Sequence, residues 1–326
     1  MRIVNYIILA HKKPRQVKRL VGRLAAEGVH CYVHVDQKCR MEEFTDAIPE
    51  SDSVTYIKDR VACRWGNLSI VDTILHCFRE IAAEGQTGHC VLLSGQDYPL
   101  RGGEEIRDFL TSHADNNFIN IYPIPDPKKK SEGGGRERLI SYTFDCRNPK
   151  DGRMKAKIQP RSVKPKTILG FFRLVRYRRD VLPFACKAWL HRREYPKGLA
   201  VCFNEMWMAL NMNTVRWLLE AWDGHPEYRD YYRYTHVPDE TVFGAMLMAN
   251  EEMRASIRPM LHYVCWEGGE GGSPKTLEME DVRWLMGDGR WKMEEGREVM
   301  FARKFEEDSP ALDYIDDEIE AGREDC

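Results

Sequence analysis

A short segment in the last third of the chain carries residue types suited to proton transfer. Val237-Pro238-Asp239-Glu240 places two carboxylates just before an apolar run. Lys275 and Lys304 follow within the next 64 residues, and each can place a point charge beside an anion. A carboxylate that deprotonates an acceptor hydroxyl, combined with cations that neutralise a departing diphosphate, would suit group transfer.

The same residues also have a structural interpretation. Pro238 suits the first position of a helix, and Asp239 and Glu240 suit its first turn because carboxylates there oppose the helix dipole. Lys304 can be an ordinary surface lysine between two buried aromatic residues, and Lys275 a solvated loop lysine. The residues alone leave both interpretations open.

The first 120 residues predict the elements that position such groups. Apolar runs of strand length occupy residues 3–9, 30–35 and 90–93, and apolar side chains recur at helical spacing in residues 17–25 and 70–81. Alternating strands and helices predict an α/β fold with a mostly parallel central sheet flanked by helices. Ligands of such sheets lie beyond the carboxyl ends of the strands, where His11, Asp36 and the turn at residues 94–99 fall.

Changes in composition suggest the organisation of the chain. We predict one catalytic domain over residues 1–305. It comprises a nucleotide-binding half (1–122), a basic loop and helical insertion (123–200) and an acceptor and catalytic half (201–305). The strongly acidic residues 306–326 predict a frayed or partly helical tail.

Residues 147–197 carry far more lysine and arginine than acidic residues, and residues 171–179 mix aromatic side chains with arginines. Such a basic amphipathic segment can dock on an anionic membrane surface. It can equally be a solvated helix face packed on its own domain.

The overall composition excludes several classes. A net charge of −2 argues against a nucleic-acid partner, and 43% hydrophobic residues suffice for a packed core. The ten cysteines show neither CxxC pairs nor metal-ligand spacing, which predicts reduced, mostly buried thiols. The first apolar run is too short for a signal peptide or a membrane span, so we expect a cytoplasmic protein, or one bound peripherally to the inner membrane face.

An ordered set of motifs resembles the core-2/I-branching β-1,6-N-acetylglucosaminyltransferase family, which includes the peptide O-xylosyltransferases. The chain looks like a bacterial member. The matching segments are residues 6–12, 34–36, 65–66, 93–100, 237–240, 266, 273–277 and 301–305.

The resemblance implies a GT-A type nucleotide-sugar glycosyltransferase fold that needs no divalent metal and no cofactor. Consistent with this, no Asp-x-Asp tripeptide ends a core strand. The resemblance also implies that Glu240 is the general base and that Lys275 and Lys304 contact the diphosphate. A general base on one face of the donor sugar and departure of the diphosphate from the other face would invert the configuration at the anomeric carbon.

Further site residues come from the resemblance. It implies that Leu9, His11 and Asp36 contact the uridine and ribose, and that Trp266 contacts the acceptor. Asp97 either organises its turn or touches a sugar, and Trp65 either faces sugar or belongs to the core. Arg136 and Arg138 lie where the family holds its acceptor, although the spacing there does not align. Asn204-Glu205 departs from a Gly-Ser common in the family.

The sequence therefore predicts an inverting transferase that moves a sugar from a UDP-sugar, with UDP-N-acetylglucosamine favoured, in β linkage to a glycan or lipid-linked glycan. The alternatives are a UDP-xylose-dependent xylosyltransferase and a non-catalytic carbohydrate or nucleotide-binding module in which Glu240 merely caps a helix.

Overall fold

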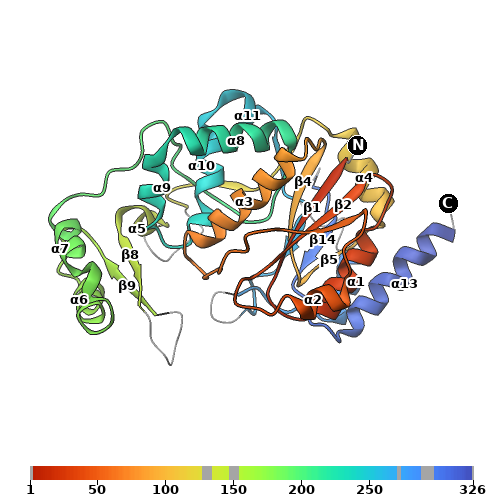
Figure 1. Cartoon of the computed structure of the whole chain (residues 1–326), viewed down its shortest axis with the longest axis horizontal. Coiled ribbons are helices and arrows are strands. Elements are labelled where there is room, and N and C mark those ends of the chain that lie inside the picture. Colours follow the sequence, from red (N-terminus) through yellow and green to blue (C-terminus); the bar gives the residue numbers. More distant parts are fainter. Residues whose placement is uncertain (1–2, 127–133, 147–153, 270–272, 288–296, 325–326) are drawn as a thin grey trace.

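The computed structural model describes residues 3–126, 134–146, 154–269, 273–287 and 297–324. Its centre is a seven-stranded sheet in the order β12-β6-β11-β4-β1-β2-β3 (Figure 1). Only β11 runs against the other six strands. The strands are β1 (Val4–Ala10), β2 (Val29–Val35), β3 (Val54–Tyr56), β4 (His89–Ser94), β6 (Asn117–Phe118), β11 (Ala209–Asn211) and β12 (Ile257–Arg258).

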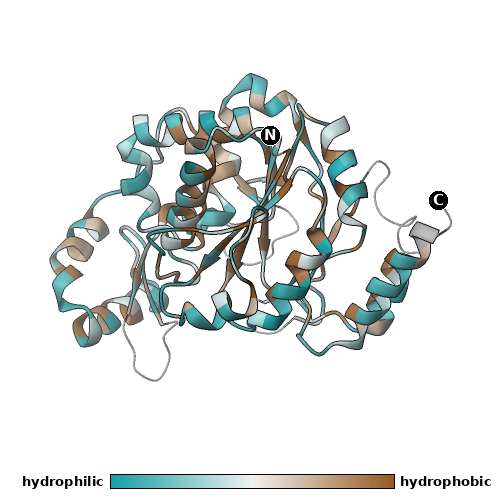
Figure 2. Ribbon diagram, turned by 45° about the vertical axis from the view of Figure 1, so that its right-hand side comes forward, coloured by the Kyte–Doolittle hydropathy of each residue, from teal (hydrophilic) through white to brown (hydrophobic). Residues whose placement is uncertain are grey.

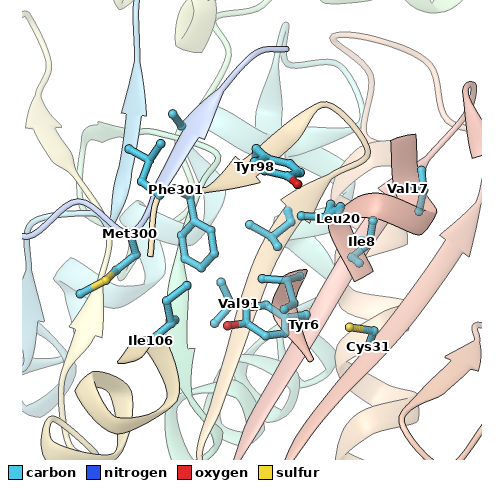
Figure 3. Packing of buried hydrophobic residues seen from close by; sticks show 14 of the residues in the cluster. Tyr6, Ile8, Val17, Leu20, Cys31, Val91, Tyr98, Ile106, Met300 and Phe301 are labelled. Atoms are coloured by element: carbon cyan, nitrogen blue, oxygen red, sulfur yellow. The ribbon is translucent and has the colours of Figure 1, made fainter. Parts of the chain in front are cut away.

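Helices cover both faces of this sheet because its strands are apolar on both sides. Tyr6 and Ile8 of β1 point into one core, and Ile7 points into the other. Figure 3 shows part of the first core, where the rings of Tyr6 and Phe301 meet edge to face at 6.1 Å. Helices α1 (Pro14–Leu24), α2 (Glu42–Ala47), α4 (Gly103–Ser112), α12 (Met279–Met286) and α13 (Pro310–Glu324) pack on this side.

The second core lies under helices that come mostly from the middle of the chain. It is rich in aromatic and methionine side chains, such as Phe78, Phe243 and Met246. The helices are α3 (Ser69–Ala83), α8 (Met212–Gly224), α9 (Pro226–Tyr232), α10 (Val242–Ala249) and α11 (Glu251–Ala255).

Two small sheets extend the carboxyl edge of the main sheet. β13 (His262–Val264), β14 (Phe301–Arg303) and β5 (Asp97–Pro99) form one, in which Arg303 lies opposite Asp97. β7 (Ile121–Pro123) pairs with β10 (Cys202–Asn204) in the other. Residues from the two ends of the chain therefore meet beside the strand ends.

A small lobe projects from this body at the end opposite α13 (Figure 1). It contains α5 (Arg136–Ile140), β8 (Tyr142–Asp145), β9 (Lys155–Ile158), α6 (Pro165–Tyr177), a 3-10 turn (Arg179–Val181) and α7 (Leu182–Leu190). Phe144, Ile158 and Leu174 belong to its own small core. Arg193 ties the lobe to the body, since its guanidinium donates to Ser141 O at 2.7 Å and lies 3.8 Å from the Tyr231 ring centroid.

The predicted α/β class and the early strands and helices are confirmed. Residues 118–122 form parts of two strands in different sheets, because the chain turns between β6 and β7. Of the two alternatives for the acidic tail, the structure shows the helical one over residues 310–324, and Ala311, Leu312 and Ile315 are fully buried in the first core. Within the predicted basic loop and helical insertion (123–200), residues 127–133 and 147–153 lie outside the described residues.

The nine cysteines that the structure describes are all unpaired, and five are buried. Burial raises the pKa of Cys31 to about 12, so this thiol is an inert packing group. Among the described helices, none combines the length and apolar character needed to cross a bilayer.

Candidate active site

The predicted nucleotide-binding residues lie at the carboxyl edge of the main sheet. β1, β2 and β4 run parallel, so the residues that follow them meet at one edge. The Asp36 amide donates to Ala10 O at 2.8 Å, and the Gly95 amide donates to Leu9 O at 3.1 Å. The structure thus brings Leu9, His11 and Asp36 together, as the resemblance implied.

His11 and Asp36 interact electrostatically. Burial is the main cause that lowers the pKa of His11; Lys12 lowers it further and Asp36 opposes the shift. The imidazole is therefore neutral near pH 7 and can both donate and accept hydrogen bonds. The Asp36 side chain is nearly buried, and it accepts from the Lys38 amide at 2.9 Å and pairs with Lys38 Nζ at 3.3 Å.

Three basic side chains gather beside this edge: Lys12, Arg303 and Lys304, which we call the cation region. Burial is the main cause that lowers the pKa of Lys12, and the charges of Arg303 and Lys304 lower it further, against the opposing effect of Glu306. Lys304 follows the end of β14, and its Nζ donates to Ser273 Oγ at 2.8 Å. Mutually repelling cations beside a strand edge favour an anion between them.

Lys275 lies on a segment next to the cation region but has its own partner. The Leu277 amide donates to Lys304 O at 2.8 Å, which fixes the two segments side by side. Lys275 Nζ pairs with Asp281 Oδ1 at 2.7 Å, and this hydrogen bond raises the pKa of Lys275. Lys275 must share or release Asp281 before it can bind a diphosphate. Residues 270–272 of its glycine-rich loop lie outside the described residues.

Arg303 links the cation region to a buried carboxylate. Its Nη1 pairs with Asp97 Oδ1 at 2.8 Å, and its guanidinium lies 4.5 Å from the Trp207 ring centroid. Asp97 is fully buried, and its Oδ2 accepts from the Ser94 amide at 2.6 Å. Burial raises the pKa of Asp97, while Arg303 and Ser94 oppose the shift. These contacts favour the turn-organising interpretation of Asp97, because a sugar contact needs an accessible carboxylate.

Glu240 ends a 3-10 turn (Pro238–Glu240) that leads into α10. Arg138 of α5 holds its carboxylate: Nη1 donates to Glu240 Oε2 at 2.5 Å. The Arg138 guanidinium also lies 5.3 Å from the centre of the Phe203 ring. The Glu240 side chain is about one quarter exposed, so solvent and a substrate hydroxyl can reach it. The pair joins residues that are 102 positions apart.

Side-chain contacts from β10 hold the turn around Glu240. Asn204 Nδ2 donates to Asp239 O, and Asn204 Oδ1 accepts from the Gly244 amide, both at 2.9 Å. Asn204 is the residue that departs from the family pattern, and here it clamps the turn from both ends. Asp239 is buried, and burial with the nearby charge of Glu240 raises its pKa to about 7. It is a supporting residue rather than a second accessible base.

The Trp65-Gly66 motif supports the other side of this turn. Val237 adopts a left-handed φ of 52°, and its amide donates to Gly66 O at 3.2 Å. Gly66 has a φ of 68°, and an added Cβ would lie 3.1 Å from His236 Cε1. We call residues 236–240 the base turn. Its close approach to Gly66 explains why a residue without a side chain is needed there.

The remaining predicted site residues lie on the surface. Arg136 begins α5 and is exposed, while Arg138, two residues later, reaches Glu240. Trp65 and Trp266 are each 49% exposed, so neither is a core residue. The Trp65 ring lies edge-on to His236 of the base turn at 5.5 Å. An exposed indole beside a carboxylate can stack on a sugar.

Residues 204–207 connect the two halves of the site. Asn204 clamps the base turn, and Trp207 lies under Arg303 of the cation region. Three residues of extended chain span at most about 11 Å. The base turn and Arg303 of the cation region therefore contact side chains that stand three residues apart in one short segment.

Sequence reasoning missed Lys12, Arg303 and the clamping role of Asn204. Lys12 and Arg303 each stand next to a predicted site residue, and a search for cations beside strand ends would have found them. No pattern in the sequence indicates the hydrogen bonds of Asn204. Within the described part of the chain, His, Cys, Asp and Glu side chains form no group that can hold a metal ion.

A separate pocket of about 700 Å³ opens between β7, β10 and β12. Arg254, Arg258 and Arg297 line it, together with apolar side chains such as Ile121. None of the predicted site residues contributes to its wall. The open edge that carries the cation region and the base turn is thus a different surface of the protein.

Comparison with known proteins adds to this geometry. A family model described as "Core-2/I-Branching enzyme" matches residues 4–285. Xylosyltransferase 2 of Rattus norvegicus is 23% identical over 327 residues, covering 94% of this chain and 32% of that protein. Xylosyltransferase 1 of Homo sapiens is 22% identical, covering 94% of this chain and 29% of that protein. The chain thus spans about a third of the length of these relatives. The family match and the helix-covered sheet confirm the predicted GT-A type fold class.

Proposed function

Because this chain belongs to the core-2/I-branching enzyme family, we propose that it is an inverting, metal-independent glycosyltransferase that uses a UDP-sugar. The favoured donor is UDP-N-acetylglucosamine, and the sugar is transferred in β linkage to a glycan or lipid-linked glycan. No cofactor takes part. The observation that carries the proposal is that residues 204–207 contact both the base turn, which carries Glu240, and Arg303 of the cation region.

The base turn supplies the proton acceptor. Glu240 takes the proton of an acceptor hydroxyl while that oxygen attacks the anomeric carbon of the donor. The bond between this carbon and the diphosphate oxygen breaks, and UDP leaves with the electron pair. Arg138 keeps the Glu240 carboxylate in one orientation through the 2.5 Å hydrogen bond, so the base need not be ordered during the reaction.

The cation region supplies the charge that a metal provides in other enzymes of this fold. Lys304 of the cation region and Lys275 on the neighbouring segment stabilise the diphosphate as negative charge develops on it. Lys12 and Arg303 add to the positive potential. His11 and Asp36, at the adjacent strand ends, bind the uridine and ribose. Trp266 and Arg136 contact the acceptor from the exposed rim.

A specific observation favours a second donor. The curated relatives named above are xylosyltransferases, so UDP-xylose is the alternative. Xylose lacks the hydroxymethyl and acetamido groups of N-acetylglucosamine, and few side chains decide such a choice. Asn204-Glu205 departs from the family pattern beside the base turn, where a donor sugar would lie. Turnover and binding across UDP-N-acetylglucosamine, UDP-xylose, UDP-glucose and UDP-galactose distinguish the two donors.

Replacement of the base tests the catalytic proposal. Glu240→Gln keeps the shape of the side chain and removes its basicity, so transfer should fall by about 10³ with UDP-sugar binding retained. Glu104→Gln on the exposed face of α4 is the matched control and should leave transfer unchanged. Full activity of Glu240→Gln would reject the general-base role. Binding without any turnover by the unmodified protein would support the alternative of a non-catalytic binding module.

Metal removal tests the cation region. Turnover that is equal with EDTA and with added Mn²⁺ agrees with lysine and arginine charges acting in place of a metal. Strict dependence on Mn²⁺ would reject this role of Lys275 and Lys304.

The acceptor and the location follow from the same proposal. A bacterial cell-surface polysaccharide or its lipid-linked precursor is the proposed acceptor, and the proposed location is the cytoplasm or the inner face of the membrane. Extracts fractionated into soluble and membrane-bound glycans, supplied with labelled donor, would identify the acceptor class. Label confined to proteins would contradict it.

A further inference from the structure

The small lobe exposes apolar side chains on the outside of a helix whose inner face is already packed. Thr167, Gly170 and Leu174 of α6 are buried against the lobe. Helix and strand lie very close, because a Cβ added at Gly170 would be 2.5 Å from Lys157 O of β9. The inner face of α6 is therefore fixed, and its opposite face points away from the protein.

That opposite face carries a stripe of large apolar residues. Ile168, Phe172 and Val175 are spaced by four and three residues, so they lie on one side of the helix. Their exposed fractions are 47%, 69% and 44%. Other large apolar residues of the lobe, exposed by 40% or more, are Ile140, Val163, Leu169, Phe184 and Leu190. Among the described residues, more than half of the exposed large hydrophobic side chains lie in this lobe.

Positive charge surrounds the stripe. Residues 161–192 hold nine lysine and arginine residues and a single acid, although the whole chain has a net charge of −2. Four exposed cations flank α6 and form no ion pair with any residue that the structure describes. They are Lys164, Lys166, Arg176 and Arg179. We call these four cations and the stripe the lobe surface.

We propose that the lobe surface docks on an anionic lipid bilayer. Phe172, Ile168 and Val175 would enter the boundary between headgroups and acyl chains, and the cations would lie at the level of the lipid phosphates. The apolar stripe of α6 suits the acyl chains at this boundary, and the four cations beside it suit the negatively charged lipid phosphates. Nucleic acid would use the cations but would leave Ile168 and Val175 exposed to water.

The position of the lobe gives the docking a consequence. Figures 1 and 2 place α6 and α7 at one end of the molecule. The hydropathy colours of Figure 2 alternate between apolar and polar residues along these helices. α5 belongs to this same lobe and carries Arg138, the partner of Glu240. Docking would keep the base turn near lipid-linked glycans. This last step rests on the proposed function, whereas the docking itself does not.

Flotation of the full chain with vesicles tests the proposal. The protein should float with an equal mixture of phosphatidylcholine and phosphatidylglycerol at low salt. It should bind less at high salt and at least about tenfold less to phosphatidylcholine alone. Ile168→Ser with Phe172→Ser should weaken binding by about tenfold or more, since both residues would no longer enter the boundary. Trp284→Ser, at an apolar residue of α12 that is 40% exposed, is the control outside the lobe and should bind normally.

Charge variants separate the contribution of the cations from that of the apolar stripe. Lys164→Gln with Lys166→Gln should reduce binding to the anionic vesicles by about tenfold or more, and should leave the weak binding to phosphatidylcholine unchanged. Absence of flotation, or equal flotation of the Ile168→Ser/Phe172→Ser variant, would overturn the proposal. Donor turnover measured on the same samples keeps the two hypotheses apart: an active protein that does not float rejects only the docking.

Discussion

The cation region and the base turn both contact residues 204–207, yet they are built in different ways. The cation region stands on strand ends, and backbone pairing between β14 and β5 sets the place of Arg303. The base turn is held by side chains: Arg138 from α5 and Asn204 from β10. A substitution in the cation region therefore changes charge at a fixed place, whereas one around the base turn changes the position of the base.

The largest effect should come from removing charge in the cation region. Lys12→Gln with Lys304→Gln should lower kcat/KM by about 10³ and weaken the binding of UDP, because the departing diphosphate gains charge in the transition state. Lys18→Gln, on the exposed face of α1, is the matched control. Calorimetry with UDP and steady-state kinetics measure both quantities. Unchanged binding of UDP would place the diphosphate elsewhere.

Loss of the buried partner of Arg303 should act on stability. Asp97→Ala leaves the Arg303 guanidinium without its carboxylate and should lower the free energy of unfolding by about 3 kcal/mol. Denaturant titration gives this value. Asp108→Ala on the surface of α4 removes an exposed carboxylate that pairs with Arg107 and should change stability by less than about 1 kcal/mol. Similar small losses in both variants would show that Asp97 is not a structural support of the cation region.

The two regions also differ in how far sequence alone predicts them. The apolar runs at β1, β2 and β4 predict parallel strands, and the ends of parallel strands share an edge, which places His11 and Asp36 together. The contact between Arg138 of α5 and Glu240 of the base turn joins residues 102 positions apart, and no periodicity encodes it. The resemblance named both residues but did not place them in contact.

The acidic tail shows a similar limit. Its charges predict a frayed or partly helical tail but give no sign of burial, whereas Ala311, Leu312 and Ile315 recur at helical spacing and pack into the first core. Beside these apolar residues, acids of α13 pair with arginines of α1, as the buried Asp316 does with Arg19 at 2.7 Å. Composition alone hides such an amphipathic helix, because the apolar face is a minority of its residues.

Two arginines of α5 allow a direct comparison at the base turn. Arg138→Gln should lower kcat by about 30-fold with donor affinity nearly unchanged, since Glu240 loses the partner that orients it. Arg138→Lys should restore part of this loss because it keeps a donor within reach. Arg136→Gln should raise the KM for the acceptor without a comparable loss in kcat. If the two glutamine variants behave alike, Arg138 acts as an acceptor contact and not through Glu240.

The last effect should come from Asp239, through the pH dependence of stability. Its pKa is about 7 in the folded protein and close to 3.8 when unfolded, so the folded state binds the proton more tightly. This contribution is fully present below about pH 4 and is lost as pH rises through 7, at about 1.4 kcal/mol for each pH unit between these values. Asp239→Asn cannot ionise and should remove this slope.

Denaturant titration at pH 5, 6, 7 and 8 compares the unmodified protein with the Asp239→Asn variant. The difference between their free energies of unfolding should change steadily up to pH 7 and then level off. Asp317→Asn, at an exposed carboxylate of α13, provides the matched control. Because the charge of Glu240 contributes to the raised pKa of Asp239, the contribution of Asp239 should level off at a lower pH in the Glu240→Gln variant than in the unmodified protein. If both proteins level off at the same pH, burial alone raises the pKa of Asp239, and the two carboxylates of the base turn do not interact.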